Sequence, residues 1–306
     1  MKADMKPTLL VSGASGLLGS ELITQILEND KYKVIALTSK KETLTQMFEG
    51  NPNLKVLHID NWVINLGLNN QIDTLINCAF PRSSKPEELA KGLLFTENII
   101  KGAIDIGVKK VINISSQSVY SQKSKSTTNE ASSVAPESLY GMAKYSSERI
   151  VATLCENHSI TFTNIRLASL TGLNFEVRMT NRFVKNALTG HPITINGGSQ
   201  RIAYLEVRDA ASALIAMLNN NVGSWETVYN LGNEQSCTIL DLAKLVKKTA
   251  EKYSINKVKL EINDGQNDFN NLIDSTLFYK QFNWQPKYNI KLMVEELFEH
   301  YKLGVN

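Results

Sequence analysis

Short hydrophobic runs alternate along the first two thirds of the chain with longer stretches whose hydrophobic residues recur every three or four positions. The run Val34–Leu37 is continuously apolar, as in a strand buried on both faces. Strands are predicted at Thr8–Val11, Lys33–Leu37, Leu54–Ile59, Thr74–Cys78, Lys110–Ile114, Thr161–Leu167 and Thr227–Leu231. Helices are predicted at Leu17–Glu28, Glu87–Ile106, Leu139–Asn157 and Asp209–Leu218. Strands joined by helix-length crossovers predict an α/β, Rossmann-type doubly wound parallel sheet.

The pattern loosens in the later part of the chain, where turn residues become more frequent. Helical spacing returns at Ile239–Lys252 and Ile290–Tyr301. We interpret Asp209 as the N-cap of the helix that follows it. We expect a main domain and a smaller C-terminal lobe that binds substrate. The main domain comprises residues 1–167 with 202–232 returning to it, and the lobe comprises 168–201 and 233–306.

Composition and charge argue against nucleic-acid-binding, membrane-spanning, disulfide-rich and metal-binding proteins. The 33 Lys and Arg residues nearly balance the 30 Asp and Glu residues and are scattered, which does not indicate a nucleic-acid partner. No apolar run reaches the roughly 18 residues of a membrane span, and the first residues lack a signal-peptide core. We therefore expect a cytoplasmic protein. Cys78, Cys155 and Cys237 are far apart, which predicts neither a disulfide framework nor a metal site.

A glycine-rich loop follows the first predicted strand and leads into the first predicted helix. In this loop Gly13 permits a tight turn, Gly16 lets the backbone approach a phosphate, and Gly19 lets the helix pack on the strand. The positive end of the helix then faces a pyrophosphate. The loop predicts that the main domain binds NAD or NADP. The expected contacts are Gly13, Ser15, Gly16, Leu17, Leu18 and Gly19.

The segment after the second strand bears on the choice of cofactor. It has no carboxylate to hold ribose hydroxyls, whereas Thr38, Ser39 and Lys40 offer hydroxyls and charge for a 2′-phosphate. This slightly favours NADP, although Lys40 could equally begin a solvated helix. After the third strand, Asp60 and Asn61 are expected to reach the adenine, with a plain turn as the alternative.

Tyr140 and Lys144 are four residues apart and share one face of a predicted helix. A free phenol has a pKa of about 10, so it needs a nearby cation to exchange protons near neutrality. Lys144 would supply this charge and bind the nicotinamide ribose, while Tyr140 acts as general acid or base. The pair alone could be a surface pair. However, the strand ending at Ser116 brings hydroxyls to the carboxyl edge of the sheet, where such folds bind ligands.

These motifs together resemble the extended short-chain dehydrogenase/reductases, the NAD-dependent epimerase/dehydratase family that includes UDP-galactose 4-epimerase. The likeness runs nearly end to end and rests on Gly13–Gly19, Ser115–Tyr120, Pro136–Glu148, Gly190–Arg201 and Phe282–Tyr288. The resemblance implies that Ser116, Tyr140 and Lys144 are catalytic. It implies further cofactor contacts from Cys78, Ala79, Phe80, Tyr140, Lys144, Leu167 and Ser169. It implies substrate contacts from Ser116, Gln117, Ser169 and Arg201, the last facing a nucleotide diphosphate.

The chain also departs from the family pattern. Gly92 stands where an asparagine is expected, and Ser169 stands where a substrate-binding asparagine is expected. No arginine occurs within 264–268, where a second diphosphate ligand is expected. Gln117 and Ser118 replace the acidic pair of the sugar dehydratases, so 4,6-dehydration is not expected.

The resemblance implies hydride transfer at a sugar carbon, C4 of a nucleotide-linked sugar, by an epimerase or a 4-ketoreductase. Two alternatives stay open: an NADPH-dependent reductase of a small non-nucleotide carbonyl compound, and a non-catalytic NADP-sensing protein on the same fold. We also expect a homodimer through Glu87–Ile106 and Leu139–Asn157, because both helices carry surplus apolar residues such as Leu93 and Leu94. The alternative is that the sheet and residues 121–136 cover these faces.

Overall fold

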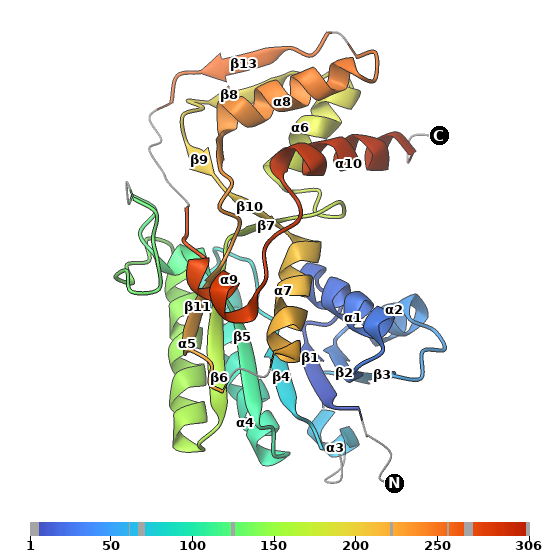
Figure 1. Ribbon diagram of the computed structural model, residues 1–306, viewed down its shortest axis with the longest axis vertical. Coiled ribbons are helices and arrows are strands. Elements are labelled where there is room, and N and C mark those ends of the chain that lie inside the picture. The colour runs from blue at the N-terminus through green and yellow to red at the C-terminus, as the bar shows by residue number, and fades with distance from the viewer. Residues whose placement is uncertain are drawn as a thin grey trace.

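A seven-stranded parallel sheet forms the centre of the molecule, with the strand order β11-β6-β5-β4-β1-β2-β3 (Figure 1). The computed structural model describes residues 6–60, 62–66, 71–123, 126–220, 223–255, 257–265 and 272–303. The strands are β1 (Thr8–Ser12), β2 (Lys33–Thr38), β3 (Leu54–His58), β4 (Thr74–Asn77), β5 (Lys110–Ser116), β6 (Thr161–Leu167) and β11 (Val228–Leu231). The predicted Rossmann-type sheet is therefore confirmed.

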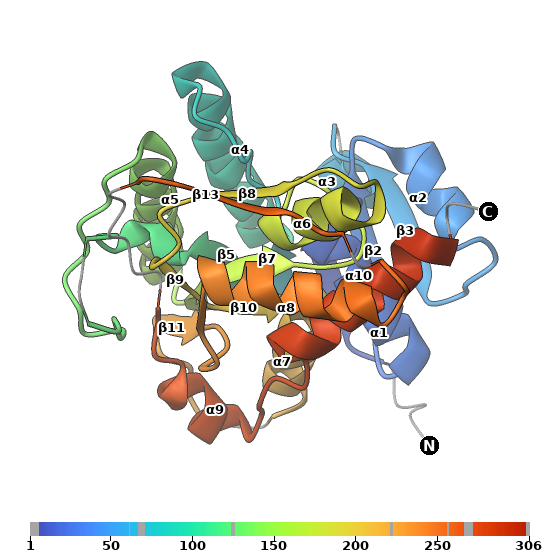
Figure 2. The same cartoon turned by 90° about the horizontal axis from the view of Figure 1, so that it is seen from above.

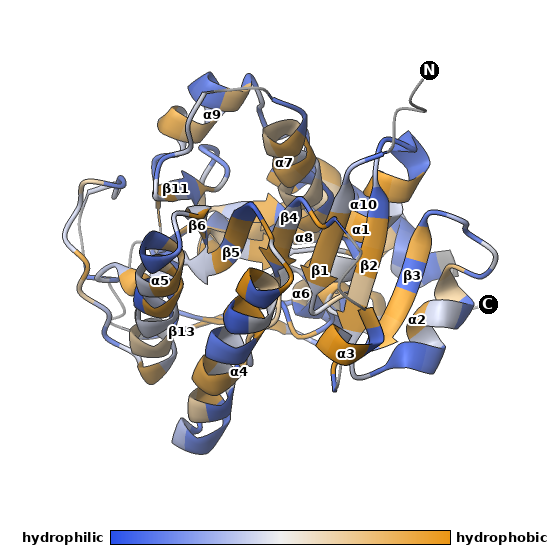
Figure 3. Ribbon diagram, turned by 90° about the horizontal axis from the view of Figure 1, so that it is seen from below, coloured by the Kyte–Doolittle hydropathy of each residue, from blue (hydrophilic) through white to orange (hydrophobic). Residues whose placement is uncertain are grey.

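Helices cover both faces of this sheet. One face carries α1 (Leu17–Asn29), α2 (Lys41–Met47) and α7 (Val207–Asn219), and the other carries α3 (Trp62–Leu66), α4 (Pro86–Asp105) and α5 (Leu139–Asn157). Residues along each strand alternate between the two hydrophobic clusters: Leu9 and Val11 pack toward α1 and α7, whereas Leu10 packs toward α4 and α5. Figure 3 shows this as hydrophobic colouring along the central strands. Strands buried on both sides explain the continuous apolar runs in the sequence.

A second group of elements lies beyond the carboxyl edge of the sheet (Figures 1 and 2). It contains the helices α6 (Met179–Leu188), α8 (Ile239–Glu251) and α10 (Ile290–Leu303), which share a separate hydrophobic cluster. Short strand pairs complete it: β7 (Ser169–Thr171) with β10 (Tyr204–Glu206), β8 (Ile193–Asn196) with β13 (Leu260–Asn263), and β9 (Arg201–Ile202) with β12 (Cys237–Thr238). α9 (Thr276–Phe282) packs near β11, and η1 (Gln117–Val119) follows β5. None of the described helices is long and apolar enough to cross a bilayer.

Helix α6 was missed by the sequence analysis, which found only a loosened pattern in this part of the chain. The helix is short, and no side-chain hydrogen bond caps its beginning at Arg178. Its apolar face consists chiefly of Phe183, Val184 and Ala187, which pack among α8, α10 and β8. These apolar residues recur at helical spacing, which was a usable signal that the sequence analysis overlooked.

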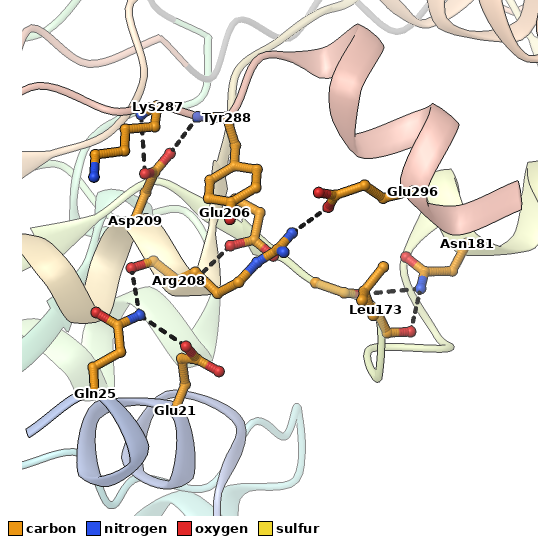
Figure 4. A network of polar contacts seen from close by, with 11 residues as sticks. Glu21, Gln25, Leu173, Asn181, Glu206, Arg208, Asp209, Lys287, Tyr288 and Glu296 are labelled. Atoms are coloured by element: carbon orange, nitrogen blue, oxygen red, sulfur yellow. Dashed lines mark hydrogen bonds and ion pairs between the residues drawn. The ribbon is translucent and has the colours of Figure 1, made fainter. Parts of the chain in front are cut away.

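Polar contacts join the start of α7 to the second group of elements. Figure 4 shows the Arg208 guanidinium between the carboxylates of Glu206 and Glu296, and it also lies 3.9 Å from the Tyr288 ring centroid. The predicted N-cap role of Asp209 is wrong. Glu206 caps α7 by accepting a hydrogen bond from the Arg208 amide at 2.5 Å, so the helix begins earlier. Asp209 lies in the first turn and instead accepts hydrogen bonds from the amides of residues 287 and 288.

Candidate active site

The glycine loop closes tightly against the neighbouring strand β4. Gly13 has a φ of 67°, and a Cβ there would lie 2.8 Å from the Ala79 nitrogen, so a larger residue is excluded. The Gly16 amide donates to the Gly13 carbonyl at 2.9 Å, and Gly16 is the N-cap of α1. No side chain caps this helix, which leaves its first amides directed at the carboxyl edge of the sheet. Open amides at a helix start could hold the pyrophosphate of a dinucleotide, and the predicted contacts of this loop stay predictions.

A ladder of buried polar side chains runs across the sheet below this loop. Ser12 Oγ donates to Asn77 Oδ1 at 2.6 Å, Asn77 Nδ2 donates to Asn113 Oδ1 at 3.0 Å, and Asn113 Nδ2 donates to Asn164 Oδ1 at 2.9 Å. The four residues are in register on β1, β4, β5 and β6. The ladder therefore fixes the relative heights of the strand ends that carry the site. The sequence analysis missed it, although asparagines within apolar strands were a usable signal.

The three predicted catalytic residues line one cleft at the carboxyl edge of the sheet. Tyr140 and Lys144 come from α5, and Ser116 comes from the end of β5. Ser138 caps α5 by accepting a hydrogen bond from the Gly141 amide at 3.0 Å, which fixes where the helix begins. The same cleft is lined by other predicted residues, namely Gly16, Leu17, Leu18, Cys78, Phe80, Gln117, Leu167 and Ser169. Residues far apart in the sequence are thus brought together beside the glycine loop.

Burial and neighbouring charges shift the pKa values of Tyr140 and Lys144. Lys144 is 3% exposed, and its Nζ donates to the Ile114 carbonyl at 2.5 Å. Burial lowers the pKa of Lys144 to about 7, against the opposing influence of Glu148. Burial also raises the pKa of Tyr140, and the charge of Arg82 and a hydrogen bond with Ser116 act in the opposite direction. In the protein without cofactor, Tyr140 is therefore protonated near neutral pH, whereas Lys144 is close to the midpoint of its titration.

Two arginines that the sequence analysis missed reach the same cleft. The Arg82 and Arg178 guanidinium groups lie 5.1 and 4.8 Å from the centroid of the Phe175 ring. Arg178 Nε is buried without a hydrogen-bond partner among the described residues. Burial, followed by the charge of Arg82, lowers the pKa of Arg178 to about 10. Two cations and an unsatisfied donor next to Tyr140 favour an anionic ligand. The position of Arg82 just after β4 was a usable signal, whereas nothing local marked Arg178.

The predicted cofactor-specificity segment has definite internal contacts. Thr38 Oγ1 donates to Ser15 Oγ at 2.8 Å and accepts from the Lys40 amide at 2.9 Å. Ser39 and Lys40 are exposed, and Lys40 precedes the first residue of α2. The Thr38 hydroxyl is therefore engaged with the glycine loop, and the preference for NADP stays a prediction.

Other predicted residues lie outside the cleft that contains Tyr140. Asp60 is exposed and lies 3.4 Å from the ring of His58. Arg201 is exposed on β9 and donates to Ser236 Oγ at 2.6 Å. Their predicted contacts with adenine and diphosphate stay predictions. Asn61 lies outside the described residues.

A buried ion pair, Arg166 with Glu148, lies behind the catalytic residues. Arg166 on β6 donates to both oxygens of Glu148 on α5, at 3.0 and 2.7 Å, and to the Tyr120 hydroxyl at 2.9 Å. Ser115 Oγ also donates to Glu148, at 2.5 Å. Both ions are almost fully buried. Every oxygen of Glu148 is thus engaged, which ties α5 to the two strands beneath it.

Comparison with known proteins identifies the family of this chain. The model of the NAD dependent epimerase/dehydratase family matches residues 9–232. The chain belongs to this family. It is 23% identical to UDP-glucuronic acid decarboxylase 3 of Arabidopsis thaliana over 318 residues, which covers 97% of this chain and 90% of the relative. The resemblance inferred from the motifs is therefore confirmed.

Solved structures share the fold of this family member over nearly its whole length. A UDP-glucuronic acid 4-epimerase from Bacillus cereus, solved with UDP-glucuronic acid and NAD, superposes with a TM-score of 0.83 at 22% identity. That match covers 97% of this chain and 99% of the other. A UDP-N-acetylglucosamine 4-epimerase from the same organism gives a TM-score of 0.80 at 23% identity, covering 97% and 96%. These structures thus share the fold of this chain over its main sheet and over the second group of elements.

Proposed function

We propose that this protein transfers hydride reversibly between C4 of a nucleotide-linked sugar and NAD(P), acting as a 4-epimerase. The observation that carries the proposal is the convergence of Ser116, Tyr140 and Lys144 with the glycine loop in one cleft. The second group of elements, beyond the carboxyl edge of the sheet, would hold the nucleotide-sugar. The relatives named above, which include 4-epimerases of UDP-linked sugars, support this substrate class.

The chemistry assigned to each residue follows from its position. The nicotinamide, when bound, accepts and returns a hydride. The amides at the start of α1 would hold its pyrophosphate, and Lys144 would contact its ribose. Tyr140 takes the proton of the C4 hydroxyl as that carbon is oxidised, while Ser116 donates a hydrogen bond to the same oxygen. Lys144 would stabilise the phenolate form of Tyr140, which is the form that accepts this proton. Tyr140 returns the proton when the C4 carbonyl is reduced on its other face.

The arginine pair narrows the substrate further. Arg82 and Arg178 would hold an anionic group, which is either the diphosphate or a carboxylate on the sugar. A sugar carboxylate favours a second candidate function, because oxidation at C4 of a uronic acid gives a β-keto acid that readily loses CO2. The absence of an acidic pair at Gln117 and Ser118 still argues against 4,6-dehydration.

Product analysis tests the proposal. The purified protein is incubated with NAD or NADP and with UDP-glucose, UDP-N-acetylglucosamine or UDP-glucuronic acid, and products are identified by proton NMR. We expect the C4 epimer of at least one of these sugars. A pentose product from UDP-glucuronic acid would instead identify the decarboxylase. Turnover of a small carbonyl compound with NADPH, together with no reaction of any UDP-sugar, would overturn the assignment.

The cofactor choice is measured separately. The hydroxyls of Thr38 and Ser39 and the charge of Lys40, without a carboxylate, slightly favour NADP in this NAD-dependent family. Titration of NADH and NADPH by fluorescence decides between them. Tighter binding of NADH would show that Lys40 does not receive a 2′-phosphate.

We further propose that two chains pair through α4 and α5. These helices pack side by side, and Leu94, Leu139 and Met142 on them are 58%, 50% and 47% exposed. Two such pairs meeting about a two-fold axis form a compact four-helix contact. Light scattering at low micromolar concentration should give twice the chain mass, and a monomer would refute the pairing.

A further inference from the structure

Gly92 on α4 makes room for the segment that follows β4. A Cβ built at Gly92 would lie 2.5 Å from Pro81 Cδ, 2.7 Å from Pro81 Cγ and 3.3 Å from Phe80 Cε2. Any side chain there would displace the proline ring, because such contacts are too short. Pro81 and Phe80 can thus pack against α4 only because residue 92 has no side chain.

The Phe80 ring contacts both members of the catalytic pair. Its centroid lies 4.2 Å from Lys144 Nζ, which is the geometry of a cation–π contact. Its ring also meets the Tyr140 ring edge to face, with 6.2 Å between centroids and an interplanar angle of 72°. Phe80 lines the cleft but offers no group that could exchange a proton.

The other groups around Lys144 do not neutralise its charge directly. Glu148 lies one helical turn further along, but both of its oxygens are engaged by Arg166, and Ser115 donates to one of them. Burial raises the pKa of the Cys78 thiol to about 12, so this neighbour is uncharged near neutrality. Tyr140 lies one turn before Lys144 on α5 and is uncharged near neutrality, because burial raises the pKa of its phenol. A buried ammonium without a bonded carboxylate is costly unless another group stabilises it.

We propose that Phe80 is a positioning residue whose ring stabilises the charged form of Lys144, and that Gly92 acts through Pro81 to hold this ring in place. In the family pattern an asparagine is expected where Gly92 stands, and here the Pro81 ring occupies the space, with the edge of the Phe80 ring beside it. The pH range of catalysis is therefore set by a residue that takes no part in proton transfer. The proposal assumes the acid–base pair of the proposed function, but it is tested below without substrate or cofactor.

The titration of Lys144 is followed by NMR of protein carrying lysine labelled with 13C at Cε, and its resonance is identified by its loss in Lys144→Met. Phe80→Leu should lower the pKa of Lys144 by about half to one unit, because the cation–π contact is lost while burial is kept. Phe80→Tyr retains an aromatic face and is the matched control, which should titrate as the wild type does. An unchanged Lys144 titration in Phe80→Leu, with the protein folded, would overturn the proposal.

A double-mutant cycle tests the role assigned to Gly92. Gly92→Ala should lower the pKa of Lys144 in the same direction, and the variant Phe80→Leu/Gly92→Ala should show no larger shift than Phe80→Leu alone. Additive shifts would mean that Gly92 does not act through the ring. If Gly92→Ala does not fold, the milder Pro81→Ala replaces it in the cycle, because Pro81 is the link between the two residues.

Activity measurements separate this proposal from the proposed function. Once a substrate is known, kcat/KM is measured against pH. The alkaline limb of this profile should move to lower pH in Phe80→Leu, by the same shift in pKa that NMR records for Lys144. A uniform loss at all pH values would indicate a merely structural role and contradict the proposal. A Lys144 resonance that moves as expected, in a protein whose wild type turns over no nucleotide-linked sugar, would sustain the role of Phe80 and reject the proposed function.

Discussion

Two buried cations lie near the catalytic residues, Lys144 lining the cleft and Arg166 behind it, and their surroundings are opposite in kind. Arg166 is bonded to both oxygens of Glu148 and to Tyr120, so its charge is permanent and fully satisfied. Lys144 has the Ile114 carbonyl and the face of Phe80, and burial lowers its pKa to about 7. Lys144 links α5 to β5, and Arg166 links β6 to α5. One cation holds the helix in place, and the other can change its charge.

This difference shows how one helix serves both structure and chemistry. A completed ion pair resists proton exchange, because either partner would be left as an unpaired buried charge. A cation left without a carboxylate keeps its pKa near neutrality, at a cost in stability. On the catalytic turn of α5, the Lys144 ammonium therefore has no bonded carboxylate. On the next turn, both oxygens of Glu148 are hydrogen-bonded to Arg166. Each of the following variants can break or sharpen this contrast.

The largest effect is expected from Tyr140→Phe. Only the phenolic oxygen and its proton are removed, so kcat should fall by about 10²–10⁴-fold, as for loss of a general acid–base group. Cofactor affinity, measured by fluorescence titration, should stay almost unchanged because the glycine loop is untouched. A variant that keeps half of the wild-type activity would remove Tyr140 from the mechanism.

The two cations should differ sharply in their contribution to stability. Arg166→Met leaves Glu148 buried and unpaired, so the free energy of unfolding should fall by about 3–5 kcal/mol. Lys144→Met removes a charge that has no bonded carboxylate, so the melting temperature should stay unchanged or rise while activity is lost. Denaturant unfolding of both variants checks this prediction. Equal destabilisation by the two substitutions would erase the proposed contrast.

The arginines should affect substrate binding more than the chemical step. Arg178→Gln and Arg82→Gln should each weaken binding of a nucleotide-linked sugar by about tenfold, as expected for loss of one charge-assisted hydrogen bond. Arg201→Gln is the matched comparison, because the family resemblance assigns Arg201 to the diphosphate although it lies outside the cleft. Calorimetric titration distinguishes the three. If only Arg201→Gln weakens binding, the anionic group of the substrate does not reach Arg82 and Arg178.

The smallest effect is a pH dependence of stability that belongs to Lys144 alone. The folded-state pKa of about 7 is below the ordinary value of 10.5, so the unfolded chain binds the proton more tightly. The cost of burying this charge is therefore full below about pH 7 and disappears as the pH rises toward 10.5. The stability gained in Lys144→Met should thus be larger at about pH 6 than at about pH 9. Melting curves at both pH values measure it, and a constant difference would contradict the assignment.

The sequence revealed those parts of the molecule that depend on local pattern. The strands buried on both faces, the glycine loop and the pair Tyr140 and Lys144 all have regular spacing or a fixed order along the chain. Features that arise from tertiary contact were missed. The role of Arg178 depends on its neighbours Phe175 and Arg82, which the local sequence does not show. Helix α6 was also missed, although its apolar residues recur at helical spacing.

Asp209 illustrates a different kind of error. The sequence analysis considered Asp209 alone, whereas Glu206, three residues earlier, caps the helix. The Asp209 carboxylate instead accepts hydrogen bonds from the amides of residues 287 and 288. Contacts across so long a sequence separation leave no trace in the local pattern.

The fate of the hydrogen on C4 tests the central claim most directly. A UDP-sugar that the protein turns over is prepared with deuterium at C4 and incubated with unlabelled cofactor in ordinary water, and product is examined by NMR and mass spectrometry. Hydride transfer within one cleft, with return to the same carbon, predicts that the epimer keeps its deuterium at C4. An epimer that has exchanged this deuterium for a solvent proton would contradict the account, because the hydrogen would then have left as a proton and not as a hydride.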